Sequence, residues 1–226
     1  AVDMASTLQV DGSITSSDGM TITTPDNTDT LSLISTDADA TQGPNLRLYR
    51  NSSSPADNDV LGLIHFEGRN DNSQDVVYAE IGAQALDVSD GSEDTNYFVN
   101  TMVAGTLRNR INALPTETVI NEESLDLDFR VESNGNANML FVDGGNDAVG
   151  IGTSSAGSFT IGDLVVGDGV GGRGITIFAA TDNESIIRFA DGTSGDQQYR
   201  GQIKYNHAED SLNFHANGAS GSAENL

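Results

Sequence analysis

The side chains best suited to metal binding or proton transfer in this 226-residue sequence are its three histidines, His65, His207 and His215. A zinc site needs several such ligands at short, fixed spacings, and the sequence contains no H-E-x-x-H or H-x-H pattern. His207 and His215 are close enough along the chain to meet across a hairpin, and at a symmetry axis such a ring can bind a metal ion. Ordinary packing or solvent exposure is the favoured interpretation, so we expect no metal site.

The paired carboxylates Glu122 and Glu123 are the best candidates for catalysis, because two carboxyl groups can hydrolyse a glycosidic bond. That reaction needs the two groups about 5–10 Å apart, one of them with a raised pKa. Neighbouring residues on a strand point to opposite faces, which argues against this pair. The sequence also has no Trp to form a sugar platform, and no G-x-S-x-G, phosphate-loop or dinucleotide motif. We therefore expect no catalytic site and no bound cofactor, and the chain is not predicted to be an enzyme.

Aspartates gather in many polar loops, and calcium prefers oxygen ligands of this kind. These loops are Asp26–Asp29, Asp37–Asp39, Asp57–Asp59, Asp71, Asp90–Asp94 and Asp143–Asp147. None of them follows the D-x-D-x-D-G-x5-E pattern of an EF-hand. The run Gly171–Gly174 begins like a calcium-binding β-roll repeat, but Thr176 stands where an aspartate is needed. Structural turns are the favoured interpretation, with bound calcium as the alternative that chelation would test.

The strong negative charge of the chain limits its partners. Its 34 acidic and 10 basic residues give a net charge of −24, which repels nucleic-acid phosphates and anionic lipid headgroups. No apolar run approaches the ~20 residues that span a bilayer, and the N-terminus lacks the basic and apolar regions of a signal peptide. The chain has no cysteine, so it has neither disulfides nor thiolate metal sites. We expect no nucleic-acid partner and no membrane insertion.

Apolar and polar residues alternate in short runs, which is the pattern of β-strands. The clearest example is LDLDFRVESNGNANMLFVDGGNDAVGIGT, residues 125–153, where Asn-Gly, Gly-Gly-Asn-Asp and Gly-Thr interrupt the alternation. The best helical window, residues 103–114, contains Gly105 and is followed by Pro115. The sequence therefore predicts an all-β fold.

Turn signals divide the chain into four predicted segments. Residues 1–42 are an N-terminal β shaft segment, 43–113 a first β module, 114–153 a connecting β repeat with the VDGGNDAVGIGT motif, and 154–226 a second β module. The two modules share a weak internal repeat, in which Gly62–Phe66 corresponds to Gly201–Tyr205. The predicted strands include Leu8–Val10, Met20–Ile22, Leu31–Leu33, Leu46–Arg50, Val60–Phe66, Val76–Leu86, Tyr97–Val103, Phe159–Ile161, Leu164–Val166, Ile175–Ala179, Ile186–Phe189, Tyr199–Tyr205 and Leu212–Phe214, with Thr106–Ile111 as a strand or a single turn.

The apolar content of the chain is low for a self-contained core. Apolar residues make up 36% of the sequence, below the usual share, and isolated hairpins are marginal in water and expose their edges. Val60–Phe66 carries apolar residues on both faces, which predicts burial on two sides, as in a seam between chains. We therefore expect the chain to assemble with identical copies. A pair of β-sandwiches within one chain is the structural alternative.

Three blocks of the sequence resemble bacteriophage tail-fibre and virion-fibre proteins: Asn45–Thr106, Asp128–Thr153 and Ile186–Gly218. The VDGGNDAVGIGT element is similar to repeat modules of marine-phage tail fibres. The resemblance implies an elongated homotrimeric fibre, with a β-prism or triple β-helix shaft and small β-sandwich-like knobs. It also implies an extracellular, virion-borne structural subunit that works with other virion proteins. Such a fibre holds a distal receptor-binding part toward a glycan or protein receptor on the host.

The resemblance leaves other roles open: a head fibre or decoration protein, a bacterial surface filament, or a polysaccharide depolymerase spike. Many such fibres continue into a self-cleaving C-terminal chaperone domain that drives trimerisation. Because the sequence ends at Leu226 and begins without Met, we expect either part of a longer fibre or a processed product.

Overall fold

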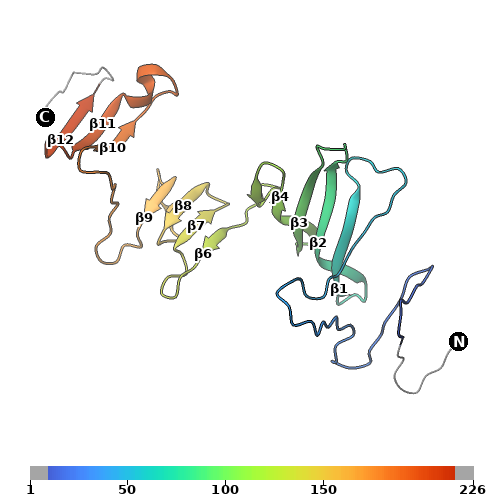
Figure 1. Cartoon of the computed structure of the whole chain (residues 1–226). Helices are drawn as coiled ribbons and strands as arrows, with labels where there is room; N and C mark the ends of the chain where they lie inside the picture. The colour runs from blue at the N-terminus through green and yellow to red at the C-terminus, as the bar shows by residue number, and fades with distance from the viewer. Residues whose placement is uncertain (1–9, 217–226) are drawn as a thin grey trace. The chain divides into compact units, whose positions relative to one another are not determined.

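The structure, a computed structural model, describes residues 10–216 and is nearly all β. Strands account for 37% of the described residues and helices for 4%. The strands described form three sheets, which are labelled in Figure 1. The prediction of an all-β fold is confirmed.

The chain divides into two compact units. The first comprises Ala1–Ile64 and Gly82–Asn96, and the second comprises His65–Ile81 and Tyr97–Leu226. The first three strands contribute residues to both units, whereas the second and third sheets belong entirely to the second unit.

The first sheet is built from five strands in the order in which they occur in the chain. They are β1 (Val60–Arg69), β2 (Asp75–Asp87), β3 (Asp94–Val103), β4 (Thr106–Ala113) and β5 (Thr118–Ile120). Ala104 and Gly105 join β3 to β4, and both have positive φ (48° and 82°), as a two-residue type I′ turn requires. The segment predicted as a strand or a single turn is therefore a strand.

The second sheet contains the motif-bearing segment, in the order β6-β7-β8-β9. Asp143 ends β7, and its carboxylate accepts the backbone N–H groups of Gly145 and Asn146. Asp147 completes the turn in the left-handed region, at φ 52°, which Asp tolerates. The Gly-Gly-Asn-Asp run is thus a tight reversal between paired strands, as predicted. The strands are β6 (Phe129–Val131), β7 (Leu140–Asp143), β8 (Ala148–Ile151) and β9 (Leu164–Val166), with a 3₁₀ turn η1 (Ala156–Ser158) and a parallel β8–β9 pair.

The third sheet is an antiparallel meander of three strands. Its register places Ile187 beside Ile203, and Ile203 beside Phe214. The strands are β10 (Glu184–Phe189), β11 (Gly201–Asn206) and β12 (Ser211–Ala216), with a 3₁₀ turn η2 (Gly195–Tyr199) before β11. All three strands are at predicted positions.

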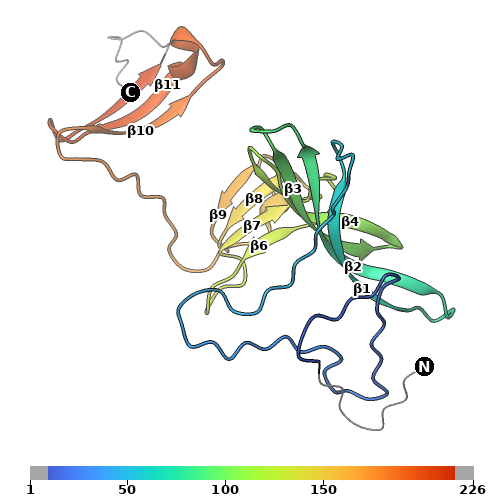
Figure 2. The ribbon, with the colours of Figure 1, turned by 45° about the vertical axis from the view of Figure 1, so that its right-hand side comes forward.

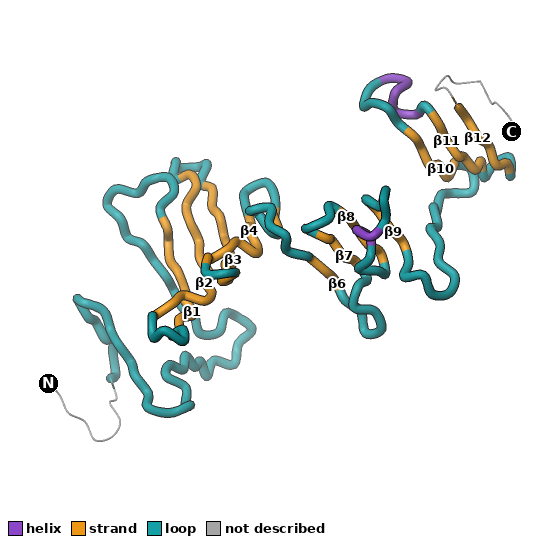
Figure 3. The backbone as a smooth tube through the Cα atoms, turned by 180° about the vertical axis from the view of Figure 1, so that it is seen from behind, coloured by secondary structure: helices purple, strands orange, loops and turns teal. Residues whose placement is uncertain are grey.

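Several other predicted strands are wrong for the single chain. Residues 10–59 contain no strand, and neither do residues 167–183; both stretches are drawn as loops in Figures 2 and 3. A strand needs a neighbouring strand for its backbone hydrogen bonds, and within residues 10–216 these segments have none. The predicted strand at Leu8–Val10 lies largely outside the described residues. The predictions that fail are Met20–Ile22, Leu31–Leu33, Leu46–Arg50, Phe159–Ile161 and Ile175–Ala179.

One of these segments nevertheless lies against a sheet. A Cβ atom built on Gly62 of β1 would lie 2.9 Å from the Cβ atom of Leu48. In the third sheet a Cβ atom on Gly201 would lie 3.4 Å from the Cβ atom of Phe189, and there the two residues are paired across strands. The internal repeat therefore includes a shared contact, an apolar side chain packed over a glycine.

The single chain buries very few large side chains. Among the described residues, the buried apolar side chains are Ala85, Phe141, Ala148 and Ala156, while 35 large apolar side chains are exposed. A globular domain of this size normally encloses Leu, Ile, Val and Phe residues. Within residues 10–216, the chain encloses no comparable core.

Candidate functional site

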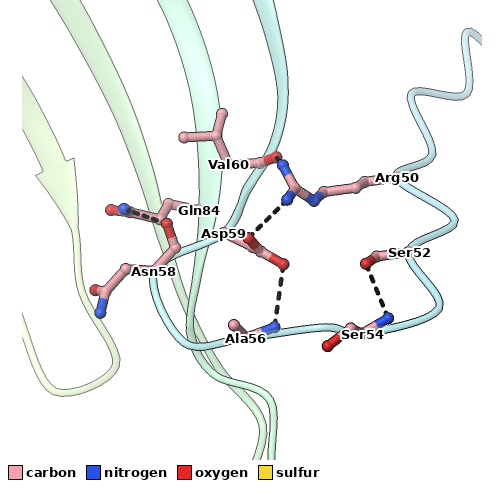
Figure 4. Close-up of polar contacts among 8 residues, drawn as sticks. All are labelled: Arg50, Ser52, Ser54, Ala56, Asn58, Asp59, Val60 and Gln84. Carbon is pink, nitrogen blue, oxygen red and sulfur yellow. Dashed lines mark hydrogen bonds and ion pairs between the residues drawn. The ribbon is translucent and has the colours of Figure 1, made fainter.

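A connected set of polar contacts organises the loop before β1, residues 50–60 (Figure 4). The guanidinium of Arg50 donates to Asp59 Oδ1 at 2.7 Å and to the Val60 carbonyl oxygen at 3.3 Å. The other carboxylate oxygen of Asp59 accepts the Ala56 backbone N–H at 3.1 Å. Asp59 thus closes the loop by binding both of its sides.

The same loop is fixed to the end of β2. The Asn58 N–H donates to the Ala85 carbonyl oxygen at 2.6 Å, and the Ala85 N–H donates to the Asp59 carbonyl oxygen at 2.9 Å. Gln84 Nε2 donates to the Asn58 carbonyl oxygen at 2.9 Å. Asn58 has φ 69°, a conformation that Asn adopts more readily than most residues. These bonds make the loop an extension of the sheet within the first unit.

A hollow of about 250 Å³ lies beside this loop. Asp87 accepts the Ser89 N–H at 2.7 Å, and Glu93 accepts the Gly91 N–H at 3.1 Å. The hydrogen bonds from Ser89 hold the pKa of Asp87 below its usual value. Thr95 Oγ1 donates to the Gln84 carbonyl oxygen at 3.0 Å. The hollow is lined by Pro55, Leu61, Ala85, Asp87, Val88, Glu93, Asp94 and Thr95.

A row of polar side chains crosses the first sheet within the second unit. The two ring nitrogens of His65, on β1, each face a glutamate. The distance from Nε2 to Glu80 Oε2 on β2 is 3.3 Å, and the distance from Nδ1 to Glu67 Oε1 is 3.4 Å. Glu80 accepts a hydrogen bond from Asn100 Nδ2 on β3 at 2.8 Å. Asn100 Oδ1 in turn accepts one from Asn109 Nδ2 on β4 at 3.0 Å. Each side chain in this row bonds to one on the neighbouring strand, so the bonds form only when the strands are in this register. The row therefore favours one register of the four strands.

Two amide oxygens near this row remain unpaired. The buried side-chain oxygens of Asn109 and Asn112 accept no hydrogen bond from residues 10–216, and Asn112 is only 8% exposed. A buried polar atom without a partner costs about 1–3 kcal/mol. Both oxygens are therefore unsatisfied acceptors within the described part of the chain.

The histidines do not come together. His207 lies in the β11–β12 turn, where Nε2 is 3.0 Å from Ser185 Oγ and the ring packs edge-on against Tyr205. His215 is paired with Gln202 at the far end of that hairpin, about 13 Å from the turn at roughly 3.3 Å per residue. The alternative in which His207 and His215 meet across the hairpin does not occur within the single chain, because the register separates them. Within residues 10–216 no three His, Asp or Glu side chains group as metal ligands.

Glu122 and Glu123 lie in a turn after β5, not on a strand, so the argument from strand alternation does not apply to them. Glu123 instead binds Arg108 Nη1 at 2.5 Å and the Asn109 N–H at 3.2 Å. The hydrogen bond from Arg108 lowers the pKa of Glu123. A glycosidase acid needs a raised pKa, so the environment of Glu123 acts in the opposite direction.

The aspartate loops are turns held by their own carboxylates. Asp26 accepts the N–H and hydroxyl of Thr28, and Asp39 accepts the same two groups of Thr41. The hydroxyl hydrogen bonds are the main reason that the pKa values of Asp26 and Asp39 are lowered. The carboxylates of Asp26, Asp39 and Asp143 each hold a turn in their own loop. The Gly171–Gly174 run lies in an irregular segment.

A second hollow, of about 400 Å³, lies beside the VDGGNDAVGIGT motif. Asn121 in its wall exchanges two hydrogen bonds with the backbone of Leu125, and Asp143 holds its own turn. The polar groups of this wall therefore stabilise local loops. The hollow is lined by Asn121, Ser124, Leu125, Val142, Asp143, Gly144, Asp147, Ala148 and Val149.

Comparison with known proteins assigns no family. No known protein-family model matches the chain, and no curated protein sequence matches it. In the part of the chain that the structure describes, no helix has the length and apolar character needed to cross a membrane. The fibre resemblance of the three sequence blocks stays a hypothesis.

Sequence reasoning missed the row formed by His65, Glu80, Asn100 and Asn109. The available signal was a polar residue at an interior position of each of four strands, as for Glu80 between Ala79 and Ile81. That signal does not say which polar residues face one another. Only the strand order and register bring them into contact.

Proposed function

We propose that this chain is a structural subunit of a homotrimeric virion fibre, of the tail-fibre kind, and that it gains its apolar core by assembly. The observation that carries the proposal is the exposure of its apolar side chains. Among the described residues, 35 large apolar side chains are exposed, and the buried apolar side chains are Ala85, Phe141, Ala148 and Ala156.

The exposed apolar side chains support the same conclusion. Both faces of β1 are open in the single chain, with exposures from 38% for Val60 to 53% for Phe66. Tyr97, Ile111 and Ile120 on β3, β4 and β5 are 39–47% exposed. Burying one such side chain fully contributes about 1.5–3 kcal/mol. Covering these residues with other copies is therefore strongly favourable.

Segments with strand-like alternation but no strand partner also support assembly. Residues 10–59 and 167–183 carry this alternation and stay irregular in one chain. In a β-prism or triple β-helix shaft, neighbouring copies would supply the missing hydrogen-bond partners. We expect these segments to become strands in the fibre, with the folded sheets as its knobs.

The number three and the virion location are supported by the resemblance of Asn45–Thr106, Asp128–Thr153 and Ile186–Gly218 to phage fibre proteins. In that setting the role is mechanical and adhesive. The subunit extends a distal receptor-binding part toward a host glycan or protein, and other virion proteins hold its base.

The first test of this proposal is the mass of the assembly in solution. We expect sedimentation equilibrium to give about 71 kDa, three times the chain mass of 23.7 kDa, because closed symmetric assembly hides the apolar faces. Negative-stain images should show thin rods. A monodisperse monomer that unfolds cooperatively would refute the proposal, since a chain with its own core has no need of copies.

A further inference from the structure

The third sheet has one apolar and one polar face. Side chains alternate along each strand, and the register aligns the alternation across all three strands. The apolar face carries Ile187, Phe189, Ile203, Tyr205, Leu212 and Phe214, together with the small residues Ser185, Gly201 and Ala216. The polar face carries Glu184, Arg188, Gln202, Lys204, Asn213 and His215, together with Ile186, Asn206 and Ser211.

The apolar face is more exposed than in a typical soluble sheet. On the apolar face, Leu212 is 59% exposed, Phe189 57% and Ile187 47%. On the polar face, Asn213 and His215 are half-buried. An antiparallel sheet normally turns its apolar face to a core and its polar face to water. The apolar face of this sheet therefore needs a cover that the single chain does not supply within residues 10–216.

We propose that the apolar face of β10–β12 packs against the same face of the other copies, so that three identical sheets enclose one shared core. The number of copies rests on the proposed function. The assignment of this particular face rests on its own charge pattern and dimensions.

The absence of charged side chains from the apolar face favours a second copy of this chain as its partner. Two chains that each carry a net charge of −24 repel one another, so they can approach only where carboxylates are absent. The apolar face has no Asp, Glu, Lys or Arg, whereas Glu184, Arg188 and Lys204 all lie on the polar face. The one ionisable side chain on the apolar face is Tyr205. Its hydroxyl donates to Asp210, which lies in the β11–β12 turn at the edge of the sheet.

The dimensions of the sheet suit a closed arrangement of three copies. Three strands at a spacing of about 4.8 Å make a wall roughly 14 Å wide. Three such walls in a triangular prism stand about 4 Å from the axis, close to half of the ~10 Å between packed sheets. Ordinary side chains fill such an interior. The polar faces, including the Lys204–Glu184 ion pair of 2.9 Å, then remain in water.

The absence of cysteine from the chain allows a direct test with single cysteines. Leu212→Cys lies on the apolar face, and its neighbour Asn213→Cys, the matched control, lies on the polar face. In the assembled protein we expect maleimide to label Leu212→Cys about tenfold more slowly than Asn213→Cys, because access limits thiol reactivity. An uncovered face would give the opposite order, since Leu212 is 59% exposed and Asn213 is half-buried. Phe214→Cys provides a second position on the same face.

The mass of each labelled sample and cross-linking between chains separate the outcomes. A short bis-maleimide should join Leu212→Cys chains of two different tag lengths into a mixed product, and should leave Asn213→Cys chains unjoined. A trimer in which Leu212→Cys labels rapidly would overturn the face assignment and leave the proposed function standing. If maleimide labels Leu212→Cys slowly but completely and the bis-maleimide still joins no chains, the chain covers its own face, which also overturns the assignment. A monomeric mass would overturn the proposed function itself.

Discussion

At the scale of single residues, several acidic side chains hold the chain's own turns. Asp26, Asp39 and Asp143 each accept N–H groups from residues two or three positions later. Short polar side chains favour such local bonds, which is why they are enriched in turns. These three aspartates therefore have a structural use in turns.

The Arg108–Glu123 pair should make stability depend on acidic pH. The hydrogen bond from Arg108 lowers the pKa of Glu123 from its ordinary value of 4.5. A folded-state pKa below the unfolded one gives a contribution that is complete above the ordinary value and is lost as pH falls through the lowered value. We expect Glu123→Gln to lower the melting temperature at neutral pH, and to have progressively less effect as the pH falls below 4.5.

Thermal unfolding followed by circular dichroism across this pH range provides the measurement. Glu122→Gln is the matched control, because Glu122 makes no hydrogen bond or ion pair with the rest of the described chain. Equal losses from Glu123→Gln at neutral and strongly acidic pH would contradict the assigned role of the ion pair.

The sequence indicates residue roles well when they are local. The Asp-Asn-Thr and Asp-Ala-Thr turns were predicted as turns because their partners lie two residues away. The row from His65 to Asn109 was not predicted, because its members come from four strands. The separation of His207 from His215 was likewise not given by their spacing along the chain, because only the register of the hairpin sets it.

At the scale of elements, β8 depends on a glycine. A Cβ atom on Gly150 would collide with the backbone carbonyl oxygen of Thr153, an atom that cannot rotate away. We expect Gly150→Ala to destabilise the protein by about 1–3 kcal/mol, as overpacking of a tight site does. Urea unfolding measures this loss. Gly135→Ala is the control, since a Cβ atom there would meet nothing within 4 Å, and equal stability of the two variants would exclude the proposed clash.

Elements formed as predicted where strand partners follow one another closely in the chain. β7 and β8 are joined by four residues, and β11 and β12 by a similar turn, so the alternation and the turn residues suffice to identify each hairpin. Met20–Ile22 and Ile175–Ala179 alternate equally well but form no strand. Alternation tells which residues can share a face, but a strand also needs an adjacent edge.

At the scale of the whole molecule, the net charge of −24 opposes the assembly that the exposed apolar residues favour. Salt screens repulsion between exposed charges but leaves apolar burial intact. We expect the chain concentration at half-dissociation to fall about tenfold or more when NaCl rises from roughly 0.01 M to 0.5 M, where the screening length shortens several-fold. Analytical ultracentrifugation at several salt concentrations measures this shift. An assembly that weakened with salt would mean that ion pairs between copies hold it together.

The sequence by itself determined the strand-forming character of the chain, the places where it turns, and its excess of negative charge. These properties follow from side-chain alternation, from glycine and aspartate in turns, and from composition, all of which act over a few residues. Only the tertiary structure decided which strands lie side by side, that Glu80 links His65 to Asn100, and that the third sheet turns its apolar face outward. Strand neighbours and exposure depend on contacts between residues far apart in the chain, and alternation along one strand does not specify them.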